Sequence, residues 1–286
     1  MKVRKAVIPV AGFGTRMLPA SRSVPKVMLP VFDTPAVHHA VSEAAEAGIE
    51  HVVFVVSPGQ EAVKDYFGRL PELEAALERR GDSRLLDRML AISDMVETSH
   101  VTQEEQRGLG HAILTARPLI GDEPFAVFLP DDVILGDAPT IGPMMGLFEE
   151  RGGSVVAVRE VPDEMVPNLG IVKAALIADR TYRIEALVEK PSLAEAPSNL
   201  AIIGRYVLPP EVFDKLAQTR AGAGGEVQIT DALSMLLAEQ EVLAYRFPGA
   251  HFDVGIPLGL LKASVYAGLQ RHDVADDLRE WLSDVV

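Results

Sequence analysis

Two glycines and two cations near the N-terminus have the types and spacing of a phosphate-binding loop. Gly12 and Gly14 follow directly after the apolar run Lys5–Val10, and Arg16 comes two residues after the second glycine. Glycines let the backbone approach a phosphate closely and direct its N–H groups at it. Lys26 lies between two prolines that restrict the backbone around it. A guanidinium and an ammonium on one loop suit a triphosphate.

This loop matches neither of the two commonest phosphate-binding motifs. A dinucleotide-binding fingerprint needs a third glycine or an alanine where Met17 stands, and a Walker loop needs Gly-Lys-Ser/Thr, which the loop lacks. A dinucleotide-dependent oxidoreductase is therefore disfavoured. Taken alone, the glycine pair is equally compatible with an ordinary turn, and Lys26 with a surface lysine.

Carboxylates at two distant positions could bind a divalent cation. Asp131 and Asp132 follow the apolar run Phe125–Leu129, and Asp253 lies far along the chain. Ligands of open α/β sheets bind beyond the carboxyl ends of the strands, and Mg²⁺ takes one or two carboxylates together with substrate phosphates. We therefore expect a metal site at Asp131, which Asp253 could complete. The competing interpretation of Asp131 is a turn or helix-capping aspartate.

Two further groups could recognise a sugar and a base. Glutamate at 189 could accept sugar hydroxyls while Lys190 holds a phosphate, provided that the strand ends there, as Pro191 favours. The amide of Gln103 could pair with a donor and an acceptor on a base edge, beside the Gly-Leu-Gly turn that starts at Gly108. His111 could be catalytic, but it is better explained as a histidine at the start of a helix whose ring nitrogens are hydrogen-bonded within the protein.

Apolar strands that alternate with helices must position these residues. The alternation predicts an α/β protein with a mainly parallel sheet covered on both faces, extended by a more antiparallel second half. The expected strands are Lys5–Val10, His51–Val56, Phe125–Leu129, Val155–Arg159, Ile171–Ile177, Arg183–Val188 and Ala201–Val207. The expected helices are Pro35–Ala47, Glu61–Arg69, Pro71–Arg80, Arg84–Ser93, Gly110–Arg117, Pro210–Gln218, Thr230–Glu239, Leu258–Leu269 and Val274–Leu282.

Composition excludes several classes of protein. The 286 residues carry a net charge of −14, which argues against binding to nucleic acid or to a membrane surface. Without cysteine there are no disulfides or thiolate ligands, and the seven histidines form no i, i+4 pair for zinc. No apolar run is long enough to span a membrane and no signal peptide is visible, so we expect a cytoplasmic protein. The acid-free segment before Asp33 could attract a small polyanion.

Taken in order, the motifs resemble one family, the bacterial UTP–glucose-1-phosphate uridylyltransferases among the sugar nucleotidyltransferases. The similarity runs from about residue 3 to residue 269. It is carried by Gly12–Pro19 (GFGTRMLP), Pro25–Pro30 (PKVMLP), Gly108–Ala112 (GLGHA), Leu129–Asp132 (LPDD), Val188–Pro191 (VEKP), Ser198–Ala201 (SNLA) and Gly225–Asp231 (GEVQITD).

This resemblance implies a Rossmann-like nucleotidyltransferase fold and a role for each motif. It implies one domain over 1–286, with a nucleotide-binding half (1–150) and a sugar-binding half with C-terminal helices (151–286). The nucleotide would contact Ala11, Gly12, Gly14, Thr15, Gln103 and Gly108. The catalytic cations would be Arg16, Lys26 and Lys190. The sugar would contact Gly170, Glu189, Lys190 and Asn199, and Mg²⁺ would be held by Asp131 and Asp253.

The implied reaction joins UTP and glucose 1-phosphate into UDP-glucose and pyrophosphate, by in-line attack of the sugar phosphate on the α-phosphorus. The resemblance also implies a homodimer or homotetramer. The chain departs from the family where Val27 replaces a usual glutamate and where Ile256-Pro257 replaces a lysine segment. Two alternatives therefore stay open. One is a transferase for another base or sugar, such as a thymidylyltransferase, and the other is a regulatory relative without turnover.

Overall fold

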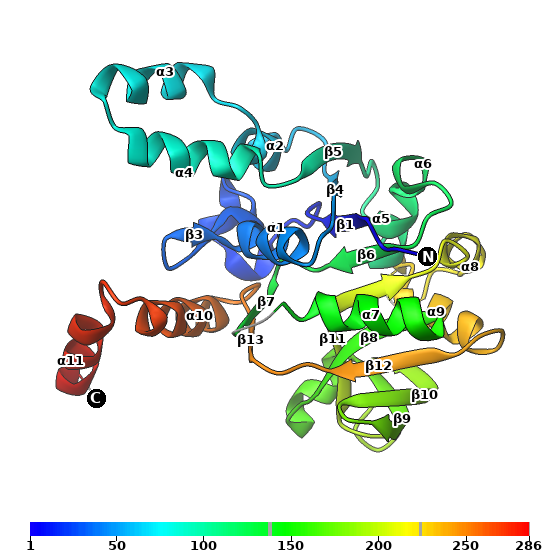
Figure 1. The fold of residues 1–286 in the computed structure, drawn as a ribbon. Helices are drawn as coiled ribbons and strands as arrows, with labels where there is room; N and C mark the ends of the chain where they lie inside the picture. The colour runs from blue at the N-terminus through cyan, green and yellow to red at the C-terminus, as the bar shows by residue number, and fades with distance from the viewer. Residues whose placement is uncertain (137–138, 223–224, 286) are drawn as a thin grey trace.

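A nine-stranded mixed sheet runs through both halves of the chain in the computed structural model, which describes residues 1–136, 139–222 and 225–285. Its strands lie in the order β5-β4-β1-β6-β11-β8-β12-β10-β9 (Figure 1). They are β1 (Lys5–Pro9), β4 (His51–Val56), β5 (Glu97–Thr102), β6 (Phe125–Phe128), β8 (Ser154–Glu160), β9 (Gly170–Ala178), β10 (Thr181–Glu189), β11 (Leu200–Leu208) and β12 (Val242–Arg246).

Strand direction changes between the two halves. β5, β4, β1 and β6 are all parallel, whereas β11 runs antiparallel to both of its neighbours β6 and β8. β10 is antiparallel to β9 and β12, and β8–β12 is a parallel pair within the second half. The predicted mixed sheet, parallel first and more antiparallel later, is confirmed.

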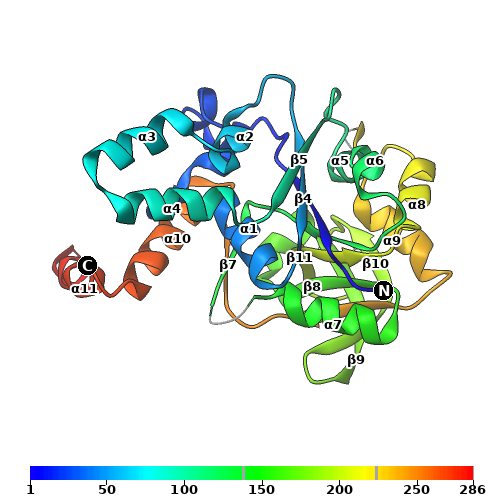
Figure 2. The same ribbon diagram turned by 45° about the horizontal axis from the view of Figure 1, so that its top comes forward.

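Side chains that alternate along the strands build a core on each face of the sheet. In β1, Ala6 and Ile8 join one apolar cluster while Val7 joins the other. Helices α1 (Ala36–Glu46) and α7 (Ile141–Arg151) cover the first face, and α5 (Leu109–Thr115), α8 (Val212–Gln218) and α9 (Ile229–Leu237) cover the second (Figures 1 and 2). Because both faces are covered, central strands such as β4 (HVVFVV) and β6 (FAVF) read as continuous apolar runs.

The other helices extend the molecule beyond the sheet. They are α2 (Ala62–Phe67), α3 (Pro71–Arg80), α4 (Ser83–Ser93), α6 (Arg117–Ile120), α10 (Pro257–Gln270) and α11 (Ala275–Val285). Figure 1 shows α3–α4 and α10–α11 projecting from the body of the molecule. Within the described ranges, no helix combines the length and the apolar character that crossing a membrane requires.

Several elements have no counterpart among the predicted ones. They are β2 (Pro30–Val31), β3 (Thr34–Pro35), β5, α6, β7 (Asp132–Leu135), α7, β12 and β13 (Ala250–Asp253). β5 reads ETSHVT and has no buried residue, so it gives no apolar signal. α7 reads IGPMMGLFEER, and its glycines and proline hide a helix that its buried apolar side chains stabilise. The predicted helix Gly110–Arg117 corresponds to α5, which ends at Thr115, and the separate short helix α6 follows it.

Candidate active site

A cavity of about 310 Å³ opens at the carboxyl ends of the parallel strands β1, β5 and β6. Parallel neighbours end at the same edge of a sheet, so residues from distant segments meet there. The lining includes Ala11 and Gly12 after β1, Gln103 after β5 and Asp131 after β6, together with Lys26. Six of the predicted site residues, these five and Gly108, thus line one cavity.

The glycine loop after β1 leaves room for the side chain of Lys26. A Cβ at Gly12 would stand 3.6 Å from Lys26 Cε. Gly14 has a left-handed backbone (φ 64°), and a Cβ there would lie 3.1 Å from both Lys26 and Ser21. The Ser21 hydroxyl donates to the Gly14 carbonyl at 2.7 Å. The glycines therefore let the Lys26 side chain pass close to the loop, while the exposed Thr15 starts a 3₁₀ turn (Thr15–Met17) whose last residue is buried.

Two carboxylates and two cations converge beside this loop. Lys26 Nζ donates to Asp131 Oδ2, and Arg16 Nη1 lies 3.4 Å from Asp253 Oδ2. Gly255 marks the centre of the group, because a Cβ on it would lie 2.9 Å from Asp253 Oδ1, 3.1 Å from Asp131 Oδ2 and 2.9 Å from Arg16 Nη2. A side chain at position 255 would collide with these groups, so the close approach depends on glycine. The carboxylate oxygens around this point are ligands of the kind that Mg²⁺ prefers.

The two carboxylates of this group titrate differently. Burial would raise the pKa of Asp131, but the adjacent charges of Lys26 and Arg16 hold it below its usual range. Burial raises the pKa of Asp253; the charge of Arg16 acts against this, and repulsion from Asp131 and Asp132 adds to it. Bringing a cation to this site would relieve that repulsion.

Pairing between β7 and β13 explains how residues 131 and 253 meet. Asp253 is the register partner of Asp132, and the Val254 N–H donates to the Asp131 carbonyl at 2.8 Å. His251 Nε2 lies 2.6 Å from Asp132 Oδ1 and fastens the same two strands. The two strands are short, so the apolar pattern does not reveal them.

The loop that is predicted to face the base contains two glycines, Gly108 and Gly110, which another segment of the chain approaches closely. A Cβ at Gly108 (φ 88°) would lie 2.7 Å from Glu226 Cβ, and a Cβ at Gly110 would lie 2.7 Å from the Val227 carbonyl. The Gly110 N–H donates to that carbonyl at 2.9 Å. The segment before α9 thus holds the loop in which Gly108 faces Gln103, whose amide Nε2 lies 3.4 Å from the Gly108 carbonyl.

The predicted sugar ligands Glu189 and Lys190 lie where β10 ends. Lys190 has a positive φ (45°), which turns the chain so that its Nζ lies 3.5 Å from Glu189 Oε1. The buried Thr230 hydroxyl donates to Glu189 Oε2 at 2.7 Å. Gly170 is the register partner of Glu189, and a Cβ there would lie 3.2 Å from the carboxylate. Glu189, Lys190 and Gly170 therefore form one group.

Asn199 is used differently from the other predicted sugar ligands. Its side-chain amide donates to the Val161 carbonyl at 3.3 Å, and its own carbonyl accepts from the Val161 N–H at 3.0 Å. These bonds join the start of β11 to the segment after β8.

Three site residues escape the sequence pattern. Ser57 and Gln106 both donate to the Ala11 carbonyl and so fix the start of the glycine loop. Thr230 orients Glu189 through a hydrogen bond. It lies within the GEVQITD motif, and the resemblance pointed to this segment but gave Thr230 itself no role. Ser57 and Gln106 are single polar residues in loops and give no such signal.

Comparison with known proteins agrees with this geometry. Residues 5–268 match the nucleotidyl transferase family. The UTP–glucose-1-phosphate uridylyltransferase of Staphylococcus epidermidis is 43% identical over 284 residues, which are 99% of each chain.

Two solved structures share the fold over nearly the whole chain. The UTP-bound UGPase from Acinetobacter baumannii is 37% identical with a TM-score of 0.91, covering 99% of this chain and 100% of that one. A UDP-glucose pyrophosphorylase complexed with UDP-glucose is 39% identical with a TM-score of 0.86, covering 94% and 100%. This chain belongs to the nucleotidyl transferase family, among the UTP–glucose-1-phosphate uridylyltransferases.

Proposed function

We propose that this chain transfers the uridylyl group of UTP to glucose 1-phosphate, giving UDP-glucose and pyrophosphate. The observation that carries the proposal is the convergence of Arg16, Lys26, Asp131 and Asp253 around one point at the carboxyl edge of the sheet. The uridylyltransferase relative and the UDP-glucose-bound neighbour support the choice of substrates.

The reaction needs no nucleophile from the protein. An oxygen of the sugar phosphate attacks the α-phosphorus in line, a P–O bond forms, and the bond to pyrophosphate breaks. Arg16 and Lys26 would neutralise the charge that develops on the triphosphate, and Lys190 would hold the sugar phosphate. Glu189 would accept sugar hydroxyls near the Gly170 backbone. Asn199 could join them only by giving up its bond to Val161.

Asp131 and Asp253 would hold Mg²⁺ together with the nucleotide phosphates. No cluster of three metal-ligating side chains occurs in the described part of the chain, which suits a cation that takes one or two carboxylates and completes its shell with substrate and water. When bound, the ion supplies positive charge next to the reacting phosphate. We expect Asp131→Asn to weaken Mn²⁺ binding in the presence of UTP, measured by electron paramagnetic resonance. Unchanged Mn²⁺ binding in this variant would contradict the assignment.

Stereochemistry at the α-phosphorus tests this direct transfer. With UTP bearing a chiral α-thiophosphate, one in-line displacement inverts the configuration, and we expect inverted UDP-glucose analogue as the product. Retention would show two displacements through a covalent intermediate and would contradict the mechanism.

The two alternatives receive less support. The uridylyltransferase relatives described above are named for UTP, and a thymidylyltransferase structure at 23% identity shares only the fold. A regulatory relative without turnover would have no need to retain the complete charged group. Val27 is buried in the core, so its departure from the family pattern lies at a packing position.

Assembly into a homodimer or homotetramer is part of the proposal. α11 exposes Trp281 (56%), and α10 exposes Leu258 and Leu261. We propose that these apolar side chains meet a second copy and that the enzyme works in the cytoplasm, where UTP is supplied. Light scattering should give the mass of two or four chains of 30.9 kDa for the wild type and a smaller mass for Trp281→Glu. A wild-type monomer would refute this part.

We further propose that one domain comprises residues 1–286, with the nucleotide bound by 1–150 and the sugar by 151–286. The continuous sheet and the position of Glu189 and Lys190 in the second half support this division.

A further inference from the structure

Two neighbours on the protein side hold the amide of Gln103 in one orientation. Its Nε2 lies 2.9 Å from His111 Nδ1 and 3.4 Å from the Gly108 carbonyl oxygen. A carbonyl oxygen can only accept a hydrogen bond, so the amide nitrogen belongs on this side. Gln103 is 4% exposed. A flipped amide would bury its oxygen against the Gly108 carbonyl oxygen, with no hydrogen between the two acceptors.

Because the Gly108 carbonyl places the amide nitrogen on this side, the neutral His111 ring meets that nitrogen with the lone pair of Nδ1. Burial lowers the pKa of His111, and the charge of Arg107 acts in the same direction. A neutral imidazole has one N–H and one lone pair, and a lone pair at Nδ1 accepts from Gln103. His111 belongs to α5, whose start is fixed by the contacts of Gly108 and Gly110 with the segment 226–227.

This arrangement leaves the amide oxygen for a ligand. Among the described residues Gln103 Oε1 has no hydrogen-bond partner, and it is not one of the buried unpaired atoms. Gln103 lines the same cavity as Lys26 and Asp131. The atom offered to a base in that cavity is therefore an acceptor.

We propose that His111 is a positioning residue that selects uracil over cytosine by fixing the orientation of Gln103. Uracil presents an N–H at N3, which Oε1 accepts, whereas cytosine presents a lone pair at N3 that Oε1 repels. This inference rests on the proposed function, in which Gln103 contacts the base. His111 itself touches Gln103 and not the nucleotide.

The test is the ratio of kcat/KM for UTP to kcat/KM for CTP. In His111→Leu, only the longer 3.4 Å contact with the Gly108 carbonyl still orients Gln103. The amide nitrogen can then turn toward the base, and we expect the ratio to fall about tenfold or more. In His111→Asn, the side-chain oxygen can take the place of Nδ1, so the ratio should recover. His272→Leu, at an exposed histidine, is the matched control and should keep the wild-type ratio. Both nucleotides are measured on one preparation, so losses from misfolding cancel.

Gln103→Leu separates the two levels of the argument. A lower ratio in Gln103→Leu with an unchanged ratio in His111→Leu would overturn the role of His111 alone. An unchanged ratio in Gln103→Leu would show that Gln103 does not read the base, and it would overturn the proposed base contact together with this inference.

Discussion

Lys26 is the single side chain on which turnover should depend most strongly. Its ammonium contacts Asp131, and its side chain passes beside Gly12 in the loop where the triphosphate is expected. Lys26→Met should lower kcat about 100-fold, because a preorganised charge at the reacting group is lost. Steady-state pyrophosphate release measures this loss, and Lys64→Met on the exposed face of α2 is the control. A kcat within threefold of the wild type would place Lys26 outside the chemistry.

Thr230 should affect sugar recognition more than nucleotide recognition. Its hydroxyl donates to Glu189 Oε2 at 2.7 Å, and Thr230→Val removes that bond at nearly constant volume. The expected result is a KM for glucose 1-phosphate raised roughly tenfold, equivalent to about 1.4 kcal/mol, with the KM for UTP unchanged. Thr230→Ser should restore the wild-type value. Equal rises in both KM values would mean that Thr230 supports the fold rather than Glu189.

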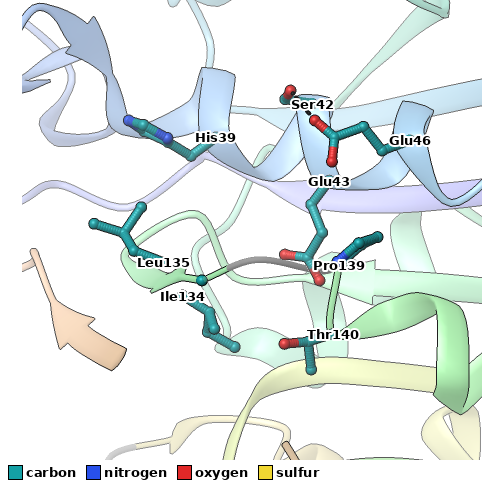
Figure 3. A pocket seen from close by; sticks show the side chains of 9 residues that line it. His39, Ser42, Glu43, Glu46, Ile134, Leu135, Pro139 and Thr140 are labelled. Atoms are coloured by element: carbon teal, nitrogen blue, oxygen red, sulfur yellow. Dashed lines mark hydrogen bonds between the residues drawn. The ribbon is translucent and has the colours of Figure 1, made fainter. Parts of the chain in front are cut away.

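At the scale of elements, a buried ion pair connects α1, α7 and β11. Arg205 on β11 is 1% exposed, and its guanidinium donates to Glu43 of α1 and to the carbonyls of Leu129 and Asp132. Glu43 points toward the start of α7, into a cavity of about 180 Å³ (Figure 3), and accepts from the Ile141 N–H at 3.0 Å. Arg205 thus also holds the turn that carries Asp131.

Removing one partner of this pair should destabilise the protein by about 3 kcal/mol or more, because a buried charge is left unpaired. Urea denaturation of Arg205→Met measures the loss. Adding Glu43→Gln should recover part of it. Arg151→Met breaks an exposed pair with Glu241 and should lose less than about 1 kcal/mol. Equal losses of stability for Arg205→Met and Arg151→Met would contradict the stabilising role given to the buried pair of Arg205 and Glu43.

Elements also show how far sequence reasoning extends. The parallel strands and the glycine loop were predictable, because buried strands leave long apolar runs and phosphate loops need glycine. The meeting of Asp131 with Asp253 was expected from the family resemblance, but the β7–β13 ladder that produces it leaves almost no apolar signal. Thr230 and His111 act through Glu189 and Gln103, and such hydrogen bonds depend on tertiary distances that spacing does not encode.

At the scale of the whole molecule, partly buried histidines make stability depend on pH. Burial lowers the pKa of His39 to about 4, with a smaller effect in the same direction from His38. The unfolded ring takes up a proton near pH 6.5, so stability is fully present above that pH and is lost as pH falls toward 4. The loss attributable to His39 approaches about 3 kcal/mol. Burial lowers the pKa of His100 as well, which adds to the same slope.

His39→Gln isolates this contribution. Its free energy of unfolding, measured against urea from pH 7.5 to 4.5, should fall less steeply than that of the wild type. His272→Gln, at an exposed histidine, should follow the wild-type curve. Parallel curves for the wild type and His39→Gln would show that the buried ring does not titrate as described.

The most direct measurement is pyrophosphate release by the purified protein with Mg²⁺, for five nucleoside triphosphates crossed with a panel of sugar 1-phosphates. The arrangement of Gln103, Lys26, Asp131, Glu189 and Lys190 predicts turnover concentrated on UTP with glucose 1-phosphate. Preference for another pair would keep the mechanism and contradict the substrate assignment. If no pair gave turnover in protein that still binds UTP, the result would contradict the assignment of this chain as an active transferase.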